Sequence, residues 1–112
     1  MSKGKSYLYT GTMGHLVATI NSLPSDPNML LKMGWVETTH PTAKIRSNTR
    51  TFIESSTGLK INFDKGRPGK PGFRGKDHYH VINPKTTGDK DLYLDKFGNP
   101  VAKRSDPSHI LP

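Results

Sequence analysis

The spacing of apolar residues near the start of the chain predicts a helix. Five of them fall at i, i+3, i+4, i+7 and i+10 and share one helical face: Met13, Leu16, Val17, Ile20 and Leu23. Thr12 belongs to the residue types that cap a helix start, and Pro24 cannot continue a helix. The pattern therefore predicts a helix between these two positions, with its apolar face against a core.

A second, shorter helix is predicted in the stretch SDPNMLLKMGW. Ser25 or Asp26 can cap its start, Pro27 suits the first helical position, and Gly34 ends it. The following residues, 35–42, are expected to form an extended segment that ends at the sequence HPT.

In the middle of the chain the spacing of apolar residues changes from the helical pattern to strict alternation with polar residues. The sequence RTFIESSTGLKINFD contains two strand-like runs joined by Ser-Ser-Thr-Gly, which predicts a β-hairpin. In the second run apolar and polar residues alternate, so they are expected on opposite faces of the strand. The apolar face carries Leu59, Ile61 and Phe63, and the polar face carries Lys60, Asn62 and Asp64. The sequence HYHVI predicts the next strand, and LYLDKFGNPVA predicts a short hairpin.

Helices followed by strands predict an α+β fold, with N-terminal helices on one face of a four- to five-stranded antiparallel sheet. The other face of such a sheet is free to meet solvent or a ligand. At 112 residues the chain has the length of a single domain, residues 1–112. Residues 1–11 are polar and are expected to be flexible.

Charge narrows the choice of partner. Lys and Arg number 17 against 9 acidic residues, giving a formal net charge of +8. Such an excess favours a polyanion, most often nucleic acid, with an acidic protein or anionic lipid as alternatives. The absence of cysteine excludes disulfides and thiolate metal sites. No apolar run approaches the roughly 18–20 residues that span a bilayer, so no membrane anchor is expected.

The strongest concentration of charge lies in residues 65–76, a stretch rich in Gly and Pro with no periodicity. Its cations are Lys65, Arg67, Lys70, Arg74 and Lys76. In an exposed loop they can act together on a phosphate backbone, and Phe73 can stack on a base. The alternative is a mobile, solvated loop with Phe73 tucked beneath it.

The loop leads into two histidines on one strand face. His78 and His80 alternate with Tyr79 and Val81, which are natural core residues, so the histidines are expected on the open face. Imidazoles suit RNA cleavage, in which one group takes the 2′-hydroxyl proton and another protonates the leaving 5′-oxygen. Neighbouring cations stabilise the charge that develops on phosphorus, and no cofactor is required. The alternative is two strand histidines without a role.

A metal site competes with this interpretation. His-x-His on a strand presents two ligands to one side, and Asp77, His40 or His109 could complete the set. The string DHYH…N is similar to part of the HNH endonuclease pattern. That site needs a helix after its hairpin, and Pro84 with the loop beyond it disfavours one.

The C-terminal sequence SDPSHILP offers one more histidine. Ile110 and Leu111 favour burial, so the tail is expected to fold back on the sheet and carry His109 to the site. Hydroxyl groups on or near the first hairpin can hold a phosphate oxygen: Thr49, Thr51, Ser55 and Ser56. The predicted catalytic residues are His78, His80, Lys76 and His109. The predicted substrate-binding residues are Lys60, Lys65, Arg67, Lys70, Phe73 and Arg74.

Three stretches carry a family resemblance: LLKMGWVETTHP, FDKGRPGKPGFRGKDHYHVINP and YLDKFGNPVAKRSDPSHILP. Over roughly residues 24–112 the chain resembles the C-terminal nuclease modules of bacterial polymorphic and contact-dependent inhibition toxins. The order of helices and sheet is similar to the barnase–EndoU–colicin–RelE group of metal-independent ribonucleases. The resemblance implies an RNA substrate, often tRNA, and a catalytic role for His78 and His80 with neighbouring Lys and Arg.

The same resemblance implies a partner and a place of action. Toxin modules of this kind are neutralised by a cognate immunity protein, commonly acidic, which suits a chain of charge +8. The module is expected to sit at the end of a larger secreted toxin and to act in the cytoplasm of a target cell. Two other functions remain open: a metal-dependent DNase on the same residues, and a basic RNA- or ribosome-binding domain without catalysis.

Overall fold

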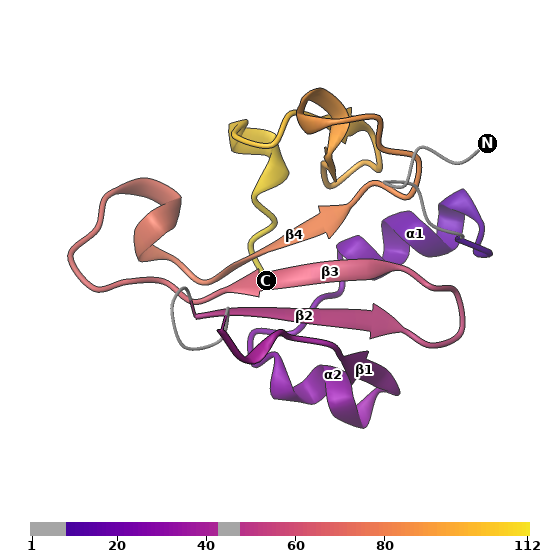
Figure 1. Cartoon of the computed structure of the whole chain (residues 1–112), viewed down its shortest axis with the longest axis horizontal. Helices are drawn as coiled ribbons and strands as arrows, with labels where there is room; N and C mark the ends of the chain where they lie inside the picture. The colour runs from indigo at the N-terminus through magenta and orange to yellow at the C-terminus, as the bar shows by residue number, and fades with distance from the viewer. Residues whose placement is uncertain (1–8, 43–47) are drawn as a thin grey trace.

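In the computed structural model, residues 9–42 and 48–112 are described, and they form two helices and a six-stranded antiparallel sheet (Figure 1). The helices are α1 (Met13–Ile20) and α2 (Asn28–Lys32). The α+β class is confirmed, but the expected four to five strands are wrong. Neither described helix is long and apolar enough to cross a membrane.

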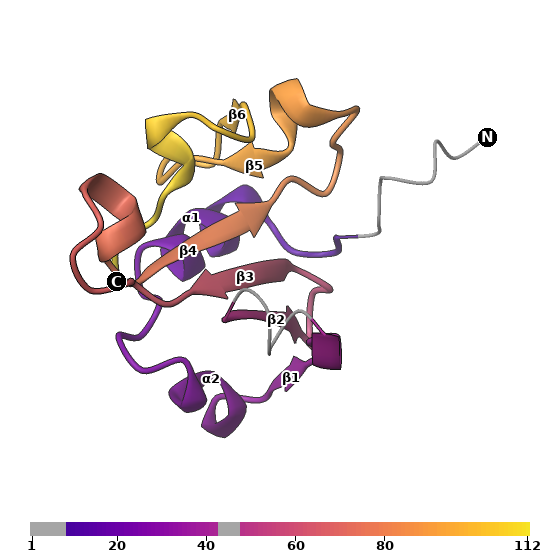
Figure 2. The same ribbon diagram turned by 60° about the vertical axis from the view of Figure 1, so that its left-hand side comes forward.

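The strands follow one another across the sheet in chain order, so each pairs with the next (Figure 2). They are β1 (Trp35–Glu37), β2 (Thr49–Glu54), β3 (Lys60–Asp64), β4 (His78–Ile82), β5 (Tyr93–Leu94) and β6 (Pro100–Val101). Strands β1, β5 and β6 have only two or three residues. These strands are defined by hydrogen bonds to the backbone of a neighbouring strand. A strand of two or three residues shows too little side-chain alternation for the number of strands to be counted from the sequence.

Alternation along the central strands sorts the side chains into two faces. On one face, buried side chains of the sheet form the core together with Leu16 and Ile20 of α1 and Leu30 of α2. The sheet contributes Phe52, Leu59, Ile61, Phe63, Tyr79 and Val81. The pairing of β3 with β4 places Asp64 opposite His78 and Asn62 opposite His80 on the other face. The predicted division of β4 between core and histidine faces is therefore confirmed.

Helix α1 is shorter than its apolar pattern predicts. Thr12 caps it as expected, since its Oγ1 accepts a hydrogen bond from the amide of His15 at 3.0 Å. Asn21 ends it by donating from Nδ2 to the carbonyl of Val17 at 2.8 Å. Leu23 is buried but lies beyond the helix, and Met13, predicted to face the core, is 61% exposed in the first turn.

Helix α2 begins one residue later than expected. Pro27 precedes it, and Asp26 rather than Ser25 supplies the side-chain contact, accepting from the amide of Asn28 at 2.9 Å. Gly34 follows the helix with φ of 95°, a left-handed conformation that favours glycine. The extended segment after it forms regular strand only over Trp35–Glu37.

The predicted flexibility of residues 1–11 falls largely on residues 1–8, which lie outside the described part of the chain. Of the rest, Tyr9 packs against the core, and the amide of Thr10 donates to the carbonyl of Thr57 at 3.0 Å. The described end of this segment is therefore attached to the hairpin between β2 and β3.

Candidate active site

Three histidines meet beside β4. His78 and His80 project from one face of the strand, and His109 comes from the C-terminal segment. The ring centroids of the three pairs lie 4.9, 4.8 and 4.8 Å apart, and one nitrogen of each ring lies within 4.8 Å of the others. This set is also the group among the described residues that could hold a metal ion.

A backbone bridge places His109. The amide of Ile110 donates to the carbonyl of Tyr79, and the amide of Tyr79 donates to the carbonyl of Ile110, both at 2.8 Å. Ile110 is buried, so the tail folds back as the sequence indicates. Leu111 does not follow the prediction: it remains 49% exposed, because it alternates away from the core.

Each imidazole is oriented by a backbone carbonyl. The Nδ1 atoms of His78, His80 and His109 contact the carbonyl oxygens of Lys76 at 2.9 Å, Ser108 at 2.9 Å and Asp106 at 3.1 Å. A carbonyl only accepts, so each Nδ1 carries a proton and donates. Nε2 is therefore the nitrogen of each ring that can exchange a proton or bind a ligand, and in His78 and His80 it faces Asp64.

Asp64 connects the two strand histidines. Its Oδ2 lies 3.4 Å from Nε2 of His78 and 3.4 Å from Nε2 of His80. Its Oδ1 accepts a hydrogen bond from Oγ1 of Thr49 at 2.6 Å, across the β2–β3 pair. The carboxylate is thereby held in place between the two imidazoles.

The environment separates the pKa values of the two histidines. Burial lowers the pKa of His78, but its contact with Asp64 and the carbonyl of Lys76 outweigh burial and raise it above the usual value. Burial lowers the pKa of His80, Asp64 opposes this, and His78 and His109 lower it further, to about 4. Burial raises the pKa of Asp64, but contacts with His78 and Thr49 leave it below the usual value. Near neutral pH His80 is thus neutral, and His78 keeps its second proton to a higher pH than His80 does.

The histidine face is not open to solvent, contrary to the prediction. His78 is 6% exposed and His80 is 7% exposed, and rings from other parts of the chain lie against them. Tyr93 stacks on His80 with centroids 4.4 Å apart, and Phe73 stacks on His109 at 4.3 Å. Phe73 therefore supports a histidine, whereas the sequence offered it as a base-stacking residue or a tucked-in loop residue.

The histidines line a cleft with a volume of about 840 Å³. Two basic arms border it, one from the loop before β4 and one from the segment after β6. Together they contribute Lys65, Arg67, Lys70, Arg74, Lys103 and Arg104. The loop and the C-terminal segment lie at the same end of β4 (Figure 2). The cleft thus combines titratable groups with converging cations.

The basic loop is exposed but folded, not open as expected. The amide of Arg67 donates to the carbonyl of Arg74 at 2.8 Å, and the amide of Gly66 donates to Oδ1 of Asp77 at 2.7 Å. A Cβ on Gly66 would lie 2.6 Å from the carbonyl oxygen of Gly75, so the two chain segments approach too closely for a side chain there. Hydrogen bonds therefore fix the backbone that carries these exposed cations.

Two predicted site residues do not line the cleft. Lys60 lies on the histidine face, but at the far end of β3, about 13 Å along the strand from Asp64. The carbonyl oxygen of Lys76 accepts a hydrogen bond from Nδ1 of His78, but Lys76 is not among the residues that line the cleft. His15 pairs with Glu54 at 3.0 Å and does not line the cleft.

Sequence reasoning missed five polar or aromatic residues of the cleft: Asp64, Tyr93, Lys103, Arg104 and Asp106. For Asp64 a signal existed, because alternation along β3 places it on the same face as Asn62, opposite the core. The other four come from the C-terminal third of the chain. The apolar Ile110 predicted that the tail returns to the sheet, but no local pattern indicates that these four side chains line the cleft.

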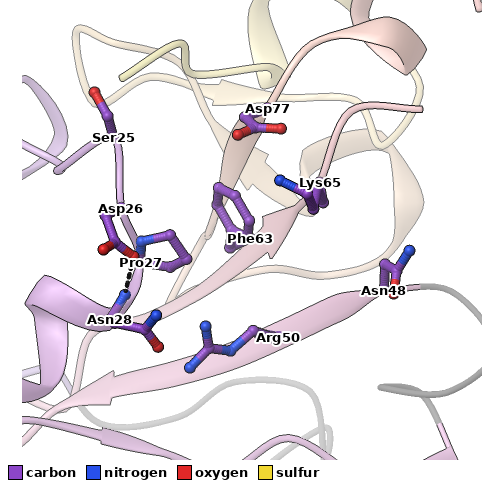
Figure 3. Close-up of a pocket in the computed structure, with 9 residues that line it drawn as sticks. All are labelled: Ser25, Asp26, Pro27, Asn28, Asn48, Arg50, Phe63, Lys65 and Asp77. Carbon is purple, nitrogen blue, oxygen red and sulfur yellow. Dashed lines mark hydrogen bonds between the residues drawn. The ribbon is translucent and has the colours of Figure 1, made fainter. Parts of the chain in front are cut away.

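A second hollow, of about 400 Å³, lies near α2 (Figure 3). Its lining carries both signs of charge, with Asp26 and Asp77 facing Arg50 and Lys65 around the ring of Phe63. Arg50 is already paired with Glu37 at 2.8 Å. The hollow has no histidine and no excess of cations, so the histidine cleft is the better candidate for chemistry on an anion.

Comparisons with protein-family models, with curated proteins and with solved structures gave no match to this chain. Any functional conclusion therefore depends on the geometry of the cleft.

Proposed function

We propose that this protein is an endoribonuclease that cleaves RNA without a metal ion, leaving a 2′,3′-cyclic phosphate and a 5′-hydroxyl. The observation that supports this most is the convergence of three imidazoles, each with Nδ1 on a backbone carbonyl, in a cleft that two basic arms also line. Phosphodiester transesterification needs a base, an acid and cations around the phosphate, and the cleft contains all three.

The two strand histidines take different roles in the proposed reaction. His80 is neutral near pH 7, so its Nε2 accepts the proton of the 2′-hydroxyl as the 2′-oxygen attacks phosphorus. The bond from phosphorus to the 5′-oxygen breaks, and the Nε2 proton of His78 passes to that oxygen. Separated pKa values in a pair of titratable groups favour such a division between base and acid.

Substrate and partners are also part of the proposal. The two arms place six cations in the lining of the histidine cleft, which suits the binding of a phosphate backbone there. The resemblance to toxin modules favours tRNA as substrate and delivery by a larger toxin into a target cell. An acidic immunity protein would complement the same cationic surface and block it.

The decisive experiment is incubation with total cellular RNA, with and without EDTA, followed by chemical mapping of the cleaved ends. We expect cleavage that persists in EDTA and yields cyclic phosphate ends. EDTA-sensitive nicking of plasmid DNA would contradict the proposal in favour of a metal-dependent DNase. Salt-sensitive RNA binding without cleavage would contradict it in favour of a non-catalytic binding domain.

Neutralising the C-terminal arm should weaken RNA binding and its dependence on salt. In the Lys103→Gln/Arg104→Gln variant, two phosphate contacts are lost, so the slope of log K against log salt should fall by about 1.4 in magnitude. Binding to a single-stranded RNA measured at several salt concentrations tests this. Lys32→Gln/Lys85→Gln removes the same charge outside the cleft lining, and it should leave the slope nearly unchanged. Equal slopes for both double variants would contradict the role of the arm.

A further inference from the structure

The three imidazoles have a second property that proton transfer does not require. One nitrogen from each of His78, His80 and His109 lies within 4.8 Å of the other two. The rings are mutually inclined, at interplanar angles of 85°, 64° and 60°, so they converge instead of stacking on one another. Three imidazoles converging on one point form a familiar donor set for transition-metal ions.

The outer contacts of the rings match those of metal-binding histidines. All three Nδ1 atoms donate to backbone carbonyls, at 2.9, 2.9 and 3.1 Å. In metal sites the non-ligating ring nitrogen makes this kind of bond, which sets the tautomer and aims the other nitrogen at the ion. Here that leaves Nε2 of every ring as the available donor.

Asp64 occupies the position of a fourth ligand. Its Oδ2 is 3.4 Å from Nε2 of His78 and 3.4 Å from Nε2 of His80. Ligands bound tetrahedrally at 2.0–2.1 Å lie about 3.3–3.4 Å from one another. Thr49 holds the other oxygen of the carboxylate, as outer partners of metal-bound carboxylates do.

We propose that His78, His80 and His109 bind one Zn²⁺ ion, or a similar divalent transition-metal ion, through Nε2, with Oδ2 of Asp64 as the fourth ligand. Three of the four donors are imidazole nitrogens, so Mg²⁺ and Ca²⁺, which prefer oxygen, are disfavoured. His109 is half-buried at the edge of the cleft. Because the three nitrogens already lie within 4.8 Å of one another, relative shifts of at most about 1.4 Å would bring them to tetrahedral spacing.

Metal binding would switch off the proposed reaction. An Nε2 lone pair bound to Zn²⁺ can neither accept a proton nor carry one, so an occupied site lacks both base and acid. With all four ligands supplied by the protein, no position remains for an activated water, as in structural zinc sites. This inhibitory consequence rests on the proposed function, whereas the binding site itself does not.

The experiment uses the full chain without a histidine tag, stripped of metal. Titration calorimetry with ZnCl₂ should give one ion per chain, and Co²⁺ should give the visible absorption of tetrahedral coordination. MgCl₂ should give no comparable heat. His109→Ala should weaken Zn²⁺ binding by at least about 10- to 100-fold, the loss seen when even outer partners of a metal site are removed.

Matched controls separate the site from surface binding. His15→Ala and His40→Ala each remove a histidine outside the cluster, and both should retain the affinity of the original chain. His80→Ala should lose binding, and Asp64→Asn should weaken it while keeping the shape of the side chain. Failure of the unaltered chain to bind Zn²⁺, or equal affinity in the His109→Ala and His15→Ala variants, would overturn the site.

Cleavage assays in the same samples distinguish this inference from the proposed function. Cleavage in EDTA that Zn²⁺ suppresses supports both. Cleavage in EDTA by a chain that binds no Zn²⁺ overturns the metal site alone. Zn²⁺ binding without RNA cleavage, or cleavage that requires Zn²⁺, overturns the metal-independent reaction and the inhibition, while the measured binding supports the site.

Discussion

Replacing His80 by alanine is expected to reduce RNA cleavage by about 10²- to 10⁴-fold, the usual contribution of a general acid or base. His80 is neutral near pH 7 and lies within 3.4 Å of Asp64 and beside the rings of His78 and His109. Among the histidines of the described cluster, His80 is the one whose pKa is lowered, mainly by burial. Single-turnover cleavage of a short RNA in EDTA measures the loss.

The His80 result must be separated from damage to the fold, because the ring is 7% exposed and stacks on Tyr93. Circular dichroism and thermal unfolding of the variant provide this check, and His80→Gln keeps more of the buried volume. The matched control is His15→Ala, which removes an exposed histidine paired with Glu54 and should leave cleavage unchanged. Full activity in a folded His80→Ala variant would show that the base lies elsewhere.

His78→Ala is expected to cause a loss of similar size, since it removes the proposed acid. Both residues serve one reaction and contact the same carboxylate, so their losses should not multiply in the double variant. A double variant as slow as either single variant would support one catalytic unit. Losses that multiply fully would indicate independent actions and would contradict the division of roles.

Phe52→Ala is expected to destabilise the domain by about 3–5 kcal/mol. Phe52 is fully buried at the centre of β2, in the core that both helices share with β3 and β4. The guanidinium of Arg50 also lies 5.0 Å from its ring centroid, so the substitution leaves both a cavity and a cation without its aromatic partner. Domains of this size are stable by about 5–15 kcal/mol, so much of the margin would be lost.

Chemical denaturation of purified variants measures the stability change for Phe52→Ala. The matched control is Phe97→Ala, which removes the same side chain from a position that is 64% exposed and should change stability by less than about 0.5 kcal/mol. If Phe52→Ala does not fold, Phe52→Leu should fold with a smaller loss, because it leaves a smaller cavity. Similar stability for the Phe52→Ala and Phe97→Ala variants would contradict the assigned core.

Periodicity was informative wherever side chains alternated over several residues. The spacing of Leu16 and Ile20 predicted the buried face of α1, and parity in β4 assigned Tyr79 and His80 to opposite faces. Short segments were less informative: the sequence LYLDKFGNPVA correctly predicted the β5–β6 hairpin, but the number of strands was predicted too low. Strands of two or three residues depend on hydrogen bonds with a neighbouring strand and leave almost no periodic signal.

The sequence by itself determined the two helices, the central hairpin, the cationic loop and the face on which His78 and His80 lie, because these follow from local spacing and charge. The apolar Ile110 also predicted that the tail carries His109 to the site. Only the tertiary structure decided how closely these groups meet: a backbone bridge between Tyr79 and Ile110 fixes His109, and strand register brings in Asp64. Such contacts join residues far apart in the chain, and no local pattern encodes the distance of 3.4 Å between a carboxylate and two imidazoles.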